Sequence, residues 1–389
     1  MDLSFSEEQN MLQESVSRLV RDHYSFQRRQ QRLEDGEDLW LRFAELGWLA
    51  VPFGEDQGGI GGSAVDVGIV MEGIGRALAV EPYLPHMLAS QLLARLAPEP
   101  LRDRYLSPAL SGDCRLALAF IEAGGRYCPW FCATSASESR GGYQINGAKD
   151  LVPGGQSADA YLVIARSHGD TRDRHGLSLF LVEREHPGLQ VRRLRTNDAA
   201  GAVQLTFENL RLGAGARLGD ADQVWPELEH TLDLGAVYQA WEAVGAMAAL
   251  SEVTLDYLKT RKQFGRPLGA NQALQHRMVD LFIAVEEARS SALCAALAMD
   301  TDDADERRRN VSLSKIAVDR CARLVGQEAV QLHGAMGVTD ELSVGHYFKR
   351  LTAIIASFGD SEWHARRIHR LDTASLSSSS QPARSQSWN

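Results

Sequence analysis

Two glycine-containing stretches carry residues suited to binding a phosphate group. In TRKQFGRPLGANQALQHRMVD, Arg261 ends one expected helix and Gln272 begins the next. An arginine beside the free N–H groups of a helix N-terminus suits a diphosphate. In QEAVQLHGAMGVTDE, an expected helix delivers Gln331 and His333 to a glycine-rich turn. By spacing alone, the plainer interpretation is favoured, namely a helix–helix connection with a surface arginine and a helix C-cap.

Other motifs give weaker signals. GGIGG at 58–62 has no preceding strand, so a flexible connector is favoured over a dinucleotide fingerprint. GGYQINGAKD resembles a phosphate loop in spacing, but a hairpin turn at Asn146 and Gly147 explains it better. Cys128 and Cys132 are not followed by a second Cys or His pair at ligand spacing, so no metal site is predicted.

The composition is that of a globular protein with room for several packed layers. Of the 389 residues, 44% are hydrophobic and 24% charged, and the net charge is −10 at pH 7. An acidic chain is a poor partner for nucleic acid or an anionic membrane. The odd number of scattered cysteines indicates reduced thiols, and MDLSFSEEQ lacks the features of a signal peptide. We therefore expect a soluble, cytoplasmic protein.

Hydrophobic periodicity divides the chain into three folded parts and a tail. Residues 1–113 are predicted to be helical, with Ser6 as an N-cap. Residues 114–221 hold short alternating runs such as AVQLTFENLRL, typical of an antiparallel β domain. Residues 222–371 carry apolar residues at steps of three and four, typical of a four-helix bundle. The serine-rich segment 372–389 is predicted to be a disordered tail, and the fold class is α+β.

Taken in order, four segments resemble the acyl-CoA dehydrogenase family. They are FAELGWLAVPFGEDQGGIGG, GYQINGAKDLVPGGQSADAYLVIAR, TRKQFGRPLGANQALQHRMVD and QLHGAMGVTDE. The segments TLDYLKTRKQFG and GHYFKRLTAIIASFGDSEWHARRI are most similar to the pimeloyl-CoA dehydrogenase small subunit and related heteromeric subunits. The resemblance implies an acyl-CoA dehydrogenase-like fold, with an N-terminal helical domain, a central antiparallel β domain and a C-terminal four-helix bundle with FAD-contacting loops.

The resemblance also implies an activity, which is FAD-dependent α,β-desaturation of an acyl-CoA thioester in fatty acid or dicarboxylic acid β-oxidation. In the family a glutamate removes the α-proton, and the β-hydrogen leaves as hydride to the flavin. The α-proton is weakly acidic, so the thioester carbonyl must be polarised in a closed pocket. The implied partners are the acyl-CoA substrate, an electron-transfer flavoprotein that reoxidises the flavin and, in the heteromeric branch, a homologous subunit.

In the family each flavin lies at a subunit interface, and one set of residues reaches the FAD of the neighbouring subunit. The resemblance assigns this cofactor-binding role here to Arg261, Phe264, Gln272, Gln331, His333 and Gly334. One departure is Ala335, which stands where the family has a second glycine.

The residues that would hold a subunit's own flavin depart further from the family. Its TEPxAGSD loop stands here as IEAGGRYCP, in which Glu122 remains. Its WIT segment beside the flavin ring is Leu151-Val152-Pro153. Proline has no N–H to offer the ring, and the hydroxyl is also missing.

A catalytic base is missing from both positions where the family places one. In ASFGDSEWH, Phe358 stands where many members carry the glutamate of a YEGT step. The second family position lies on the helix before Arg261 and is Gly235 here. Neither residue type can accept the α-proton, so no catalytic residue is assigned from the sequence.

Four nearby carboxylates are candidates for a displaced base, and a structural role is favoured for each. Asp360 can cap the following helix, and Glu362 lies on a mostly polar face. Asp233 lies beside the second base position, and Glu242 can be a paired core carboxylate.

We therefore predict the base-lacking subunit of a heteromeric FAD-dependent acyl-CoA dehydrogenase. Two alternatives stay open at this point. One is a self-sufficient homotetrameric dehydrogenase with Asp360 or Glu362 as a displaced base, and the other is a non-catalytic scaffold subunit. The loss of the base residues argues against the first alternative, and the retained Arg261 and Gln331 argue against the second.

Overall fold

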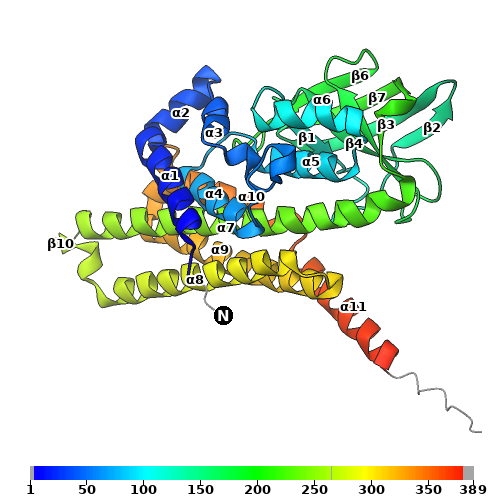
Figure 1. Ribbon diagram of the computed structural model, residues 1–389. Helices are drawn as coiled ribbons and strands as arrows, with labels where there is room; N and C mark the ends of the chain where they lie inside the picture. Colours follow the sequence, from blue (N-terminus) through cyan, green and yellow to red (C-terminus); the bar gives the residue numbers. More distant parts are fainter. Residues whose placement is uncertain (1–3, 264, 380–389) are drawn as a thin grey trace, which may run out of the picture.

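The computed structural model describes residues 4–263 and 265–379. The chain forms helices, then a β domain, then a bundle of long helices. Figure 1 shows the N-terminal helices and the β domain along one side of the long helix α7 (Ala221–Thr260), with α8 (Gln272–Leu297) on its other side. The α+β fold class and the three-part architecture predicted from the sequence are confirmed.

The N-terminal part is a set of α-helices, of which α4 is the most buried. Their bounds are α1 Glu7–His23, α2 Phe26–Asp35, α3 Trp40–Glu45, α4 Ala64–Ala77, α5 Tyr83–Leu96 and α6 Glu99–Leu110. The predicted N-cap Ser6 begins α1, and its Oγ accepts the Gln9 N–H at 3.2 Å. A Cβ on Gly75 of α4 would lie 1.9 Å from the Glu242 carbonyl oxygen of α7. Glycine at this position therefore lets the two helix backbones touch.

The central part is an eight-stranded, mainly antiparallel sheet. Its strands are β1 Leu116–Ala119, β2 Ser135–Ser139, β3 Gly142–Pro153, β4 Ala160–Arg166, β5 Leu177–Glu183, β6 Leu189–Leu194, β7 Ala202–Gly213 and β8 Arg217–Leu218. The order is β6-β7-β3-β2-β4-β5-β8, and β1 and β2 each pair with β4 in parallel. This sheet forms one wall of the site described below.

One predicted turn lies elsewhere. Asn146 and Gly147 are inside β3, where the register with β7 shifts between Ile145 and Gly147, as in a β-bulge. The turn between β2 and β3 is at Arg140 and Gly141, where Gly141 has a φ of 83°. The prediction of a hairpin turn at Asn146 and Gly147 is wrong, because β7 pairs with β3 on both sides of the bulge and extends the strand through it.

The C-terminal part is the bundle. Besides α7 and α8 it contains α9 Ala304–His333, α10 Ser343–Ile355 and α11 Ser361–Ser379. Helix α11 includes residues 372–379, which were predicted to belong to the disordered tail, and Arg309 forms an ion pair with Asp372 there. The boundary predicted at residue 372 therefore lies inside α11, and the disorder of the tail stays a prediction. Residues 380–389 lie outside the described residues.

Two further findings bear on function. None of the helices that the structure describes is long and apolar enough to cross a membrane. Within residues 4–263 and 265–379, no group of three or more His, Cys, Asp or Glu side chains is placed to hold a metal ion.

Candidate functional site

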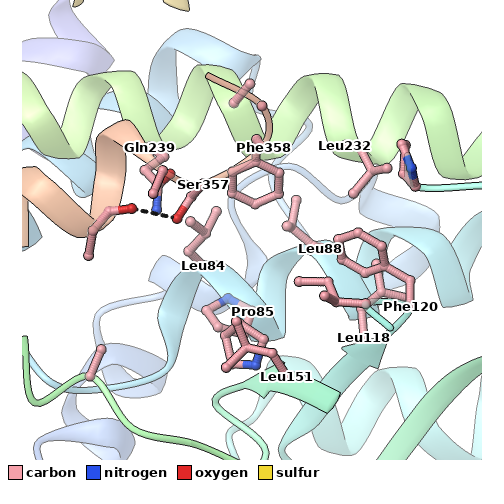
Figure 2. Close-up of a pocket in the computed structure, with 18 of the residues that line it drawn as sticks. Leu84, Pro85, Leu88, Leu118, Phe120, Leu151, Leu232, Gln239, Ser357 and Phe358 are labelled. Atoms are coloured by element: carbon pink, nitrogen blue, oxygen red, sulfur yellow. Dashed lines mark hydrogen bonds between the residues drawn. The ribbon is translucent and has the colours of Figure 1, made fainter. Parts of the chain in front are cut away.

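A cavity of about 820 Å³ lies between the β domain, the N-terminal helices and the bundle. Figure 2 shows the apolar side chains of its walls. They are Leu84, Pro85 and Leu88 of α5, Leu118 of β1, Phe120, Leu151 of β3, Leu232 of α7, and Phe358 in the turn between α10 and α11. A concave, mostly apolar site of this size suits the apolar part of a small-molecule ligand.

The two positions where a base was expected meet at one wall of this cavity. A Cβ on Gly235 would lie 2.5 Å from Cε1 and 2.7 Å from Cζ of Phe358. The Phe358 ring therefore lies directly on the backbone of α7 at Gly235. Neither residue offers a proton acceptor, so the wall where the family acts on the α-proton is apolar in this chain.

The turn that carries Phe358 is held by buried polar groups. Phe358 has a φ of 54°, a conformation that non-glycine residues seldom adopt. Burial, with a smaller effect of Lys315 and Arg367, lowers the pKa of His364 to about 3. The imidazole is therefore neutral and carries one proton. Its Nε2 donates that proton to the Phe358 carbonyl at 3.1 Å, so its Nδ1 accepts a hydrogen bond from the Ser312 hydroxyl at 3.1 Å. The backbone of the turn at Phe358 is thus held by hydrogen bonds through His364 to Ser312.

The two candidate bases near Phe358 do not reach the cavity. Asp360 Oδ1 accepts the Trp363 N–H at 2.9 Å. Asp360 thus caps α11, which is the structural role predicted for it from the sequence. Glu362 is exposed and forms an ion pair with Arg366 one turn along α11. Neither Asp360 nor Glu362 lines the cavity.

The two candidate carboxylates on α7 line the cavity but are bound to arginines. Arg367 donates to both oxygens of Asp233 at 2.6 and 3.0 Å. Arg350 donates to Glu242 at 2.6 and 2.8 Å and to Asp198 at 2.6 Å. Burial raises the pKa of Asp198, but Arg350 outweighs burial and holds that pKa below its ordinary value. Asp233 and Glu242 are therefore held in ion pairs and are not free to approach a ligand as a base.

Strand β3 forms the opposite wall. Leu151 and Pro153 line the cavity at the positions of the family's WIT segment, and Pro153 has no N–H to donate. Glu122, retained from the family loop, accepts from Lys149 Nζ at 2.6 Å and from the Thr134 hydroxyl at 2.8 Å. Burial raises the pKa of Glu122, but Lys149 and the hydrogen bonds outweigh burial and lower it. Glu122 is therefore a support for β3 and not a base.

The predicted cofactor-binding residues gather at another place, where α7 and α9 end. The Tyr257 ring of α7 stacks on His333 of α9 with ring centroids 4.3 Å apart. The Tyr257 hydroxyl donates to the His333 carbonyl at 3.4 Å. Arg261 directly follows α7, and its carbonyl accepts the Leu268 N–H at 2.9 Å. These contacts bring the two predicted stretches together at one end of the bundle, next to β10 in Figure 1.

The side chains at this end face outward, with one exception. Arg261, Gln272, Gln331 and Gly334 are exposed, whereas His333 is buried, and burial lowers its pKa. A Cβ on Gly334, where φ is 61°, would meet no atom within 4 Å. An exposed guanidinium, two amides and the N-terminus of α8 are donors that fit the phosphates of a dinucleotide. Phe264 lies outside the described residues.

This donor group, Arg261, Gln272 and Gln331, belongs to a different place from the cavity. Gly235 and Thr260 lie on the continuous helix α7, 25 residues apart. At about 1.5 Å per residue, they are separated by about 38 Å along the helix axis. Arg261 therefore does not reach the cavity of its own chain.

Matches to family models decide the classification. The model described as the N-terminal domain of acyl-CoA dehydrogenase matches residues 6–113, the middle domain 122–210 and the C-terminal domain 225–371. The chain is a member of the acyl-CoA dehydrogenase family. It is therefore an oxidoreductase of a family that acts on acyl-CoA thioesters with FAD as the cofactor.

Individual relatives agree with this classification. The chain is 27% identical over 321 residues to the mitochondrial short-chain specific acyl-CoA dehydrogenase of Mus musculus, covering 80% of this chain and 77% of the relative. The FAD complex of PigA has the same fold, with a TM-score of 0.88 at 24% identity, covering 97% of this chain and all of PigA. A chain of the ChsE4-ChsE5 complex from Mycobacterium tuberculosis is similar, with a TM-score of 0.85 at 26% identity. The match covers 98% of this chain and 100% of that chain.

Sequence reasoning missed two features of the site. Phe358 and Gly235 were treated as separate positions, and their contact required the packing of α7 against the α10–α11 turn. Gln239, which lines the cavity, was not singled out. A signal for it was present, because Gln239 lies four residues after Gly235 and so on the same face of one helix.

Proposed function

We propose that this chain is the subunit of a heteromeric acyl-CoA dehydrogenase that lacks the catalytic base. The observation that carries the proposal is the contact between Phe358 and Gly235, which fills both family base positions with groups that accept no proton. The four nearby carboxylates support it further, because each is capping a helix, exposed or bound to arginine. The similar ChsE4-ChsE5 complex is an assembly of two named chains.

The chain's role toward the cofactor is to complete the FAD site of a homologous partner subunit. Arg261, Gln272 and Gln331 donate to the dinucleotide from the exposed end of the bundle, about 38 Å from the chain's own cavity. FAD, when bound, accepts the β-hydrogen of the acyl-CoA as hydride, and an electron-transfer flavoprotein reoxidises it. The partner subunit supplies the carboxylate that takes the α-proton. The assembly works in the cytoplasm in the β-oxidation of a fatty or dicarboxylic acid.

The alternative of a self-sufficient enzyme with a displaced base has less support. Asp360 and Glu362, the two candidates for such a base, lie outside the cavity lining. A pure scaffold is disfavoured for a different reason. Exposed arginine and glutamine side chains around an open glycine serve no packing purpose in this chain, and they match donors for a phosphate-bearing group.

The test is flavin retention by the complex of this chain with its co-expressed homologue. Arg261→Ala should weaken FAD binding, because a hydrogen bond from a charged group contributes roughly 1.5–3 kcal/mol. Flavin occupancy is measured by absorbance after dilution and dialysis. The Arg261 side chain is exposed, so thermal unfolding of the subunit should not change.

The matched control is Lys262→Ala, which removes a neighbouring exposed charge from the same loop and should leave flavin occupancy unchanged. If the Arg261→Ala complex keeps its flavin at the wild-type level, Arg261 does not contact the cofactor. The proposed role toward the partner's FAD is then wrong.

A further inference from the structure

Gln239 has a buried amide oxygen that lacks a hydrogen-bond partner in the part of the chain that the structure describes. Its side chain lines the cavity, and the residue is only 4% exposed. The Oε1 atom is buried and accepts no hydrogen bond from any residue that the structure describes. The large majority of buried side-chain polar atoms have a partner, so each exception calls for a reason.

The surroundings of Gln239 are otherwise apolar or already satisfied. It lies one helical turn from Gly235 on α7, and Figure 2 shows it beside Ser357 and Phe358 at the cavity wall. The Ser357 hydroxyl donates to the Ala353 carbonyl at 2.8 Å. On the other side of the Phe358 ring the labelled walls are apolar, with Leu88, Phe120 and Leu232 among them.

The neighbouring charges are not available to Gln239. Glu242 and Asp198 are bound to Arg350, and Asp233 is bound to Arg367. A charged group on a ligand would therefore meet this part of the cavity without a free counter-ion among these residues. A neutral group that both donates and accepts would meet an amide that does the same.

We propose that Gln239 recognises one uncharged polar group, a hydroxyl or a carbonyl, on the otherwise apolar acyl group of a thioester ligand. This inference rests on the proposed function, to which it adds that the chain's own cavity takes an acyl-CoA. With the α-carbon placed beside Gly235 and Phe358, as the family base positions imply, Gln239 lies one helical turn away, which separates the polar group from the thioester by several carbons. The chain therefore prefers an oxygenated fatty acyl group to a plain one.

The experiment is direct binding to the purified full chain by calorimetry. The probes are octanoyl-CoA and octanoyl-CoA hydroxylated at each of its last four carbons. At least one hydroxylated probe should bind roughly tenfold or more tightly than octanoyl-CoA, since the plain chain leaves a buried amide unsatisfied. Gln239→Leu should abolish this preference while keeping the affinity for octanoyl-CoA.

Thermal unfolding separates recognition from a structural role. Replacing an unsatisfied buried amide with an apolar group of similar size should raise the melting temperature of the ligand-free chain, whereas loss of a structural hydrogen bond would lower it. The control is Gln91→Leu, because Gln91 bonds to Met87 and Tyr238 at 3.4 Å and does not line the cavity. It should leave the preference intact. Gln239→Met is the second variant if the leucine variant folds poorly.

Three results would overturn the inference. They are equal affinity of the wild type for plain and hydroxylated probes, no binding of any probe, and an equal loss of affinity for all probes in Gln239→Leu with a lower melting temperature. None of these measurements depends on turnover. A chain that desaturates octanoyl-CoA by itself would contradict the proposed function and leave the assignment of Gln239 standing.

Discussion

The two ends of helix α7 differ in what they keep of an acyl-CoA dehydrogenase. At the C-terminal end, Arg261 lies beside the end of α9, and exposed donors surround an open glycine turn. Nearer the N-terminal end, Gly235 lies under the Phe358 ring in an apolar wall. One end thus presents exposed donors that suit a cofactor, and at the other, under the proposed function, neither residue can take a proton.

Under the proposed function, this difference means that the cavity keeps its structure although it lacks a catalytic base. The cavity measures about 820 Å³, and the turn that carries Phe358 is held by His364 and Ser312 through a complete hydrogen-bond chain. A region free of constraint would not keep a non-glycine residue at a φ of 54° with this support. The cavity end is therefore a built feature, with packing where the family has a carboxylate.

The largest effect expected at the cavity end comes from breaking the buried Glu122–Lys149 pair under β3. Lys149→Met should destabilise the chain by about 3–5 kcal/mol, because it leaves a buried carboxylate without its counter-charge. Urea unfolding measures the change. The double variant Glu122→Gln with Lys149→Met should recover much of the loss. A cost below about 1 kcal/mol for Lys149→Met would show that Glu122 is not held by this pair.

The second prediction concerns the contact between the two base positions. Gly235→Glu should destabilise the chain by about 3 kcal/mol, since its Cβ would lie 2.5 Å from the Phe358 ring. Adding Phe358→Gly should restore most of that stability, because it removes the ring and relieves the positive φ. The measurement is a double-mutant cycle by urea unfolding. Strictly additive effects would mean that the two positions do not touch.

The third prediction is a pH dependence from His364. Its pKa in the folded chain, about 3, lies below the ordinary value near 6.5, so the unfolded chain binds the extra proton first. Stability is therefore lost as the pH falls below about 6.5, by about 2 kcal/mol between pH 6.5 and 5. His364→Asn should remove the contribution of His364 to the pH dependence of the unfolding free energy. His86, whose pKa burial also lowers to about 3, keeps its own share and serves as the internal reference. An unchanged profile would contradict a neutral, buried His364.

The smallest effect is expected for Glu362, which is exposed on α11. Glu362→Gln removes an ion pair with Arg366 on the surface and should change stability by less than about 0.5 kcal/mol. Turnover by the assembled complex should also stay the same. Loss of turnover in this variant would contradict the absence of a base at the cavity end, because it would place a working base near Phe358.

The sequence was sufficient for much of the fold and for part of the site. Long helices with apolar stripes and alternating strands gave the three parts, because these patterns are local. The assignment of Arg261 and Gln331 to the FAD of a neighbouring subunit came from the family resemblance and stays a prediction. Helix α11 continues past the boundary predicted at residue 372, and the sequence pattern does not report the ion pair of Asp372 with Arg309.

The features of the site that the sequence did not predict depend on contacts between segments that are distant in the chain. Phe358 meets Gly235 only because the α10–α11 turn packs on the middle of α7. The binding of Glu242 and Asp198 by the same arginine likewise joins three elements that are far apart in the chain. Whether a carboxylate is a free base or a bound partner is decided by such contacts, and no single-sequence pattern reports them.

The measurement that tests the central claim most directly is turnover by the isolated chain. A dye-coupled assay of the purified, FAD-supplemented protein would use short, long and dicarboxylyl CoA esters. We predict no desaturation by the chain alone, and turnover when it is assembled with a homologue that carries a glutamate at either family base position. Clear turnover by the chain alone that disappears in Asp360→Asn or Glu362→Gln would contradict the base-lacking role and establish a displaced base.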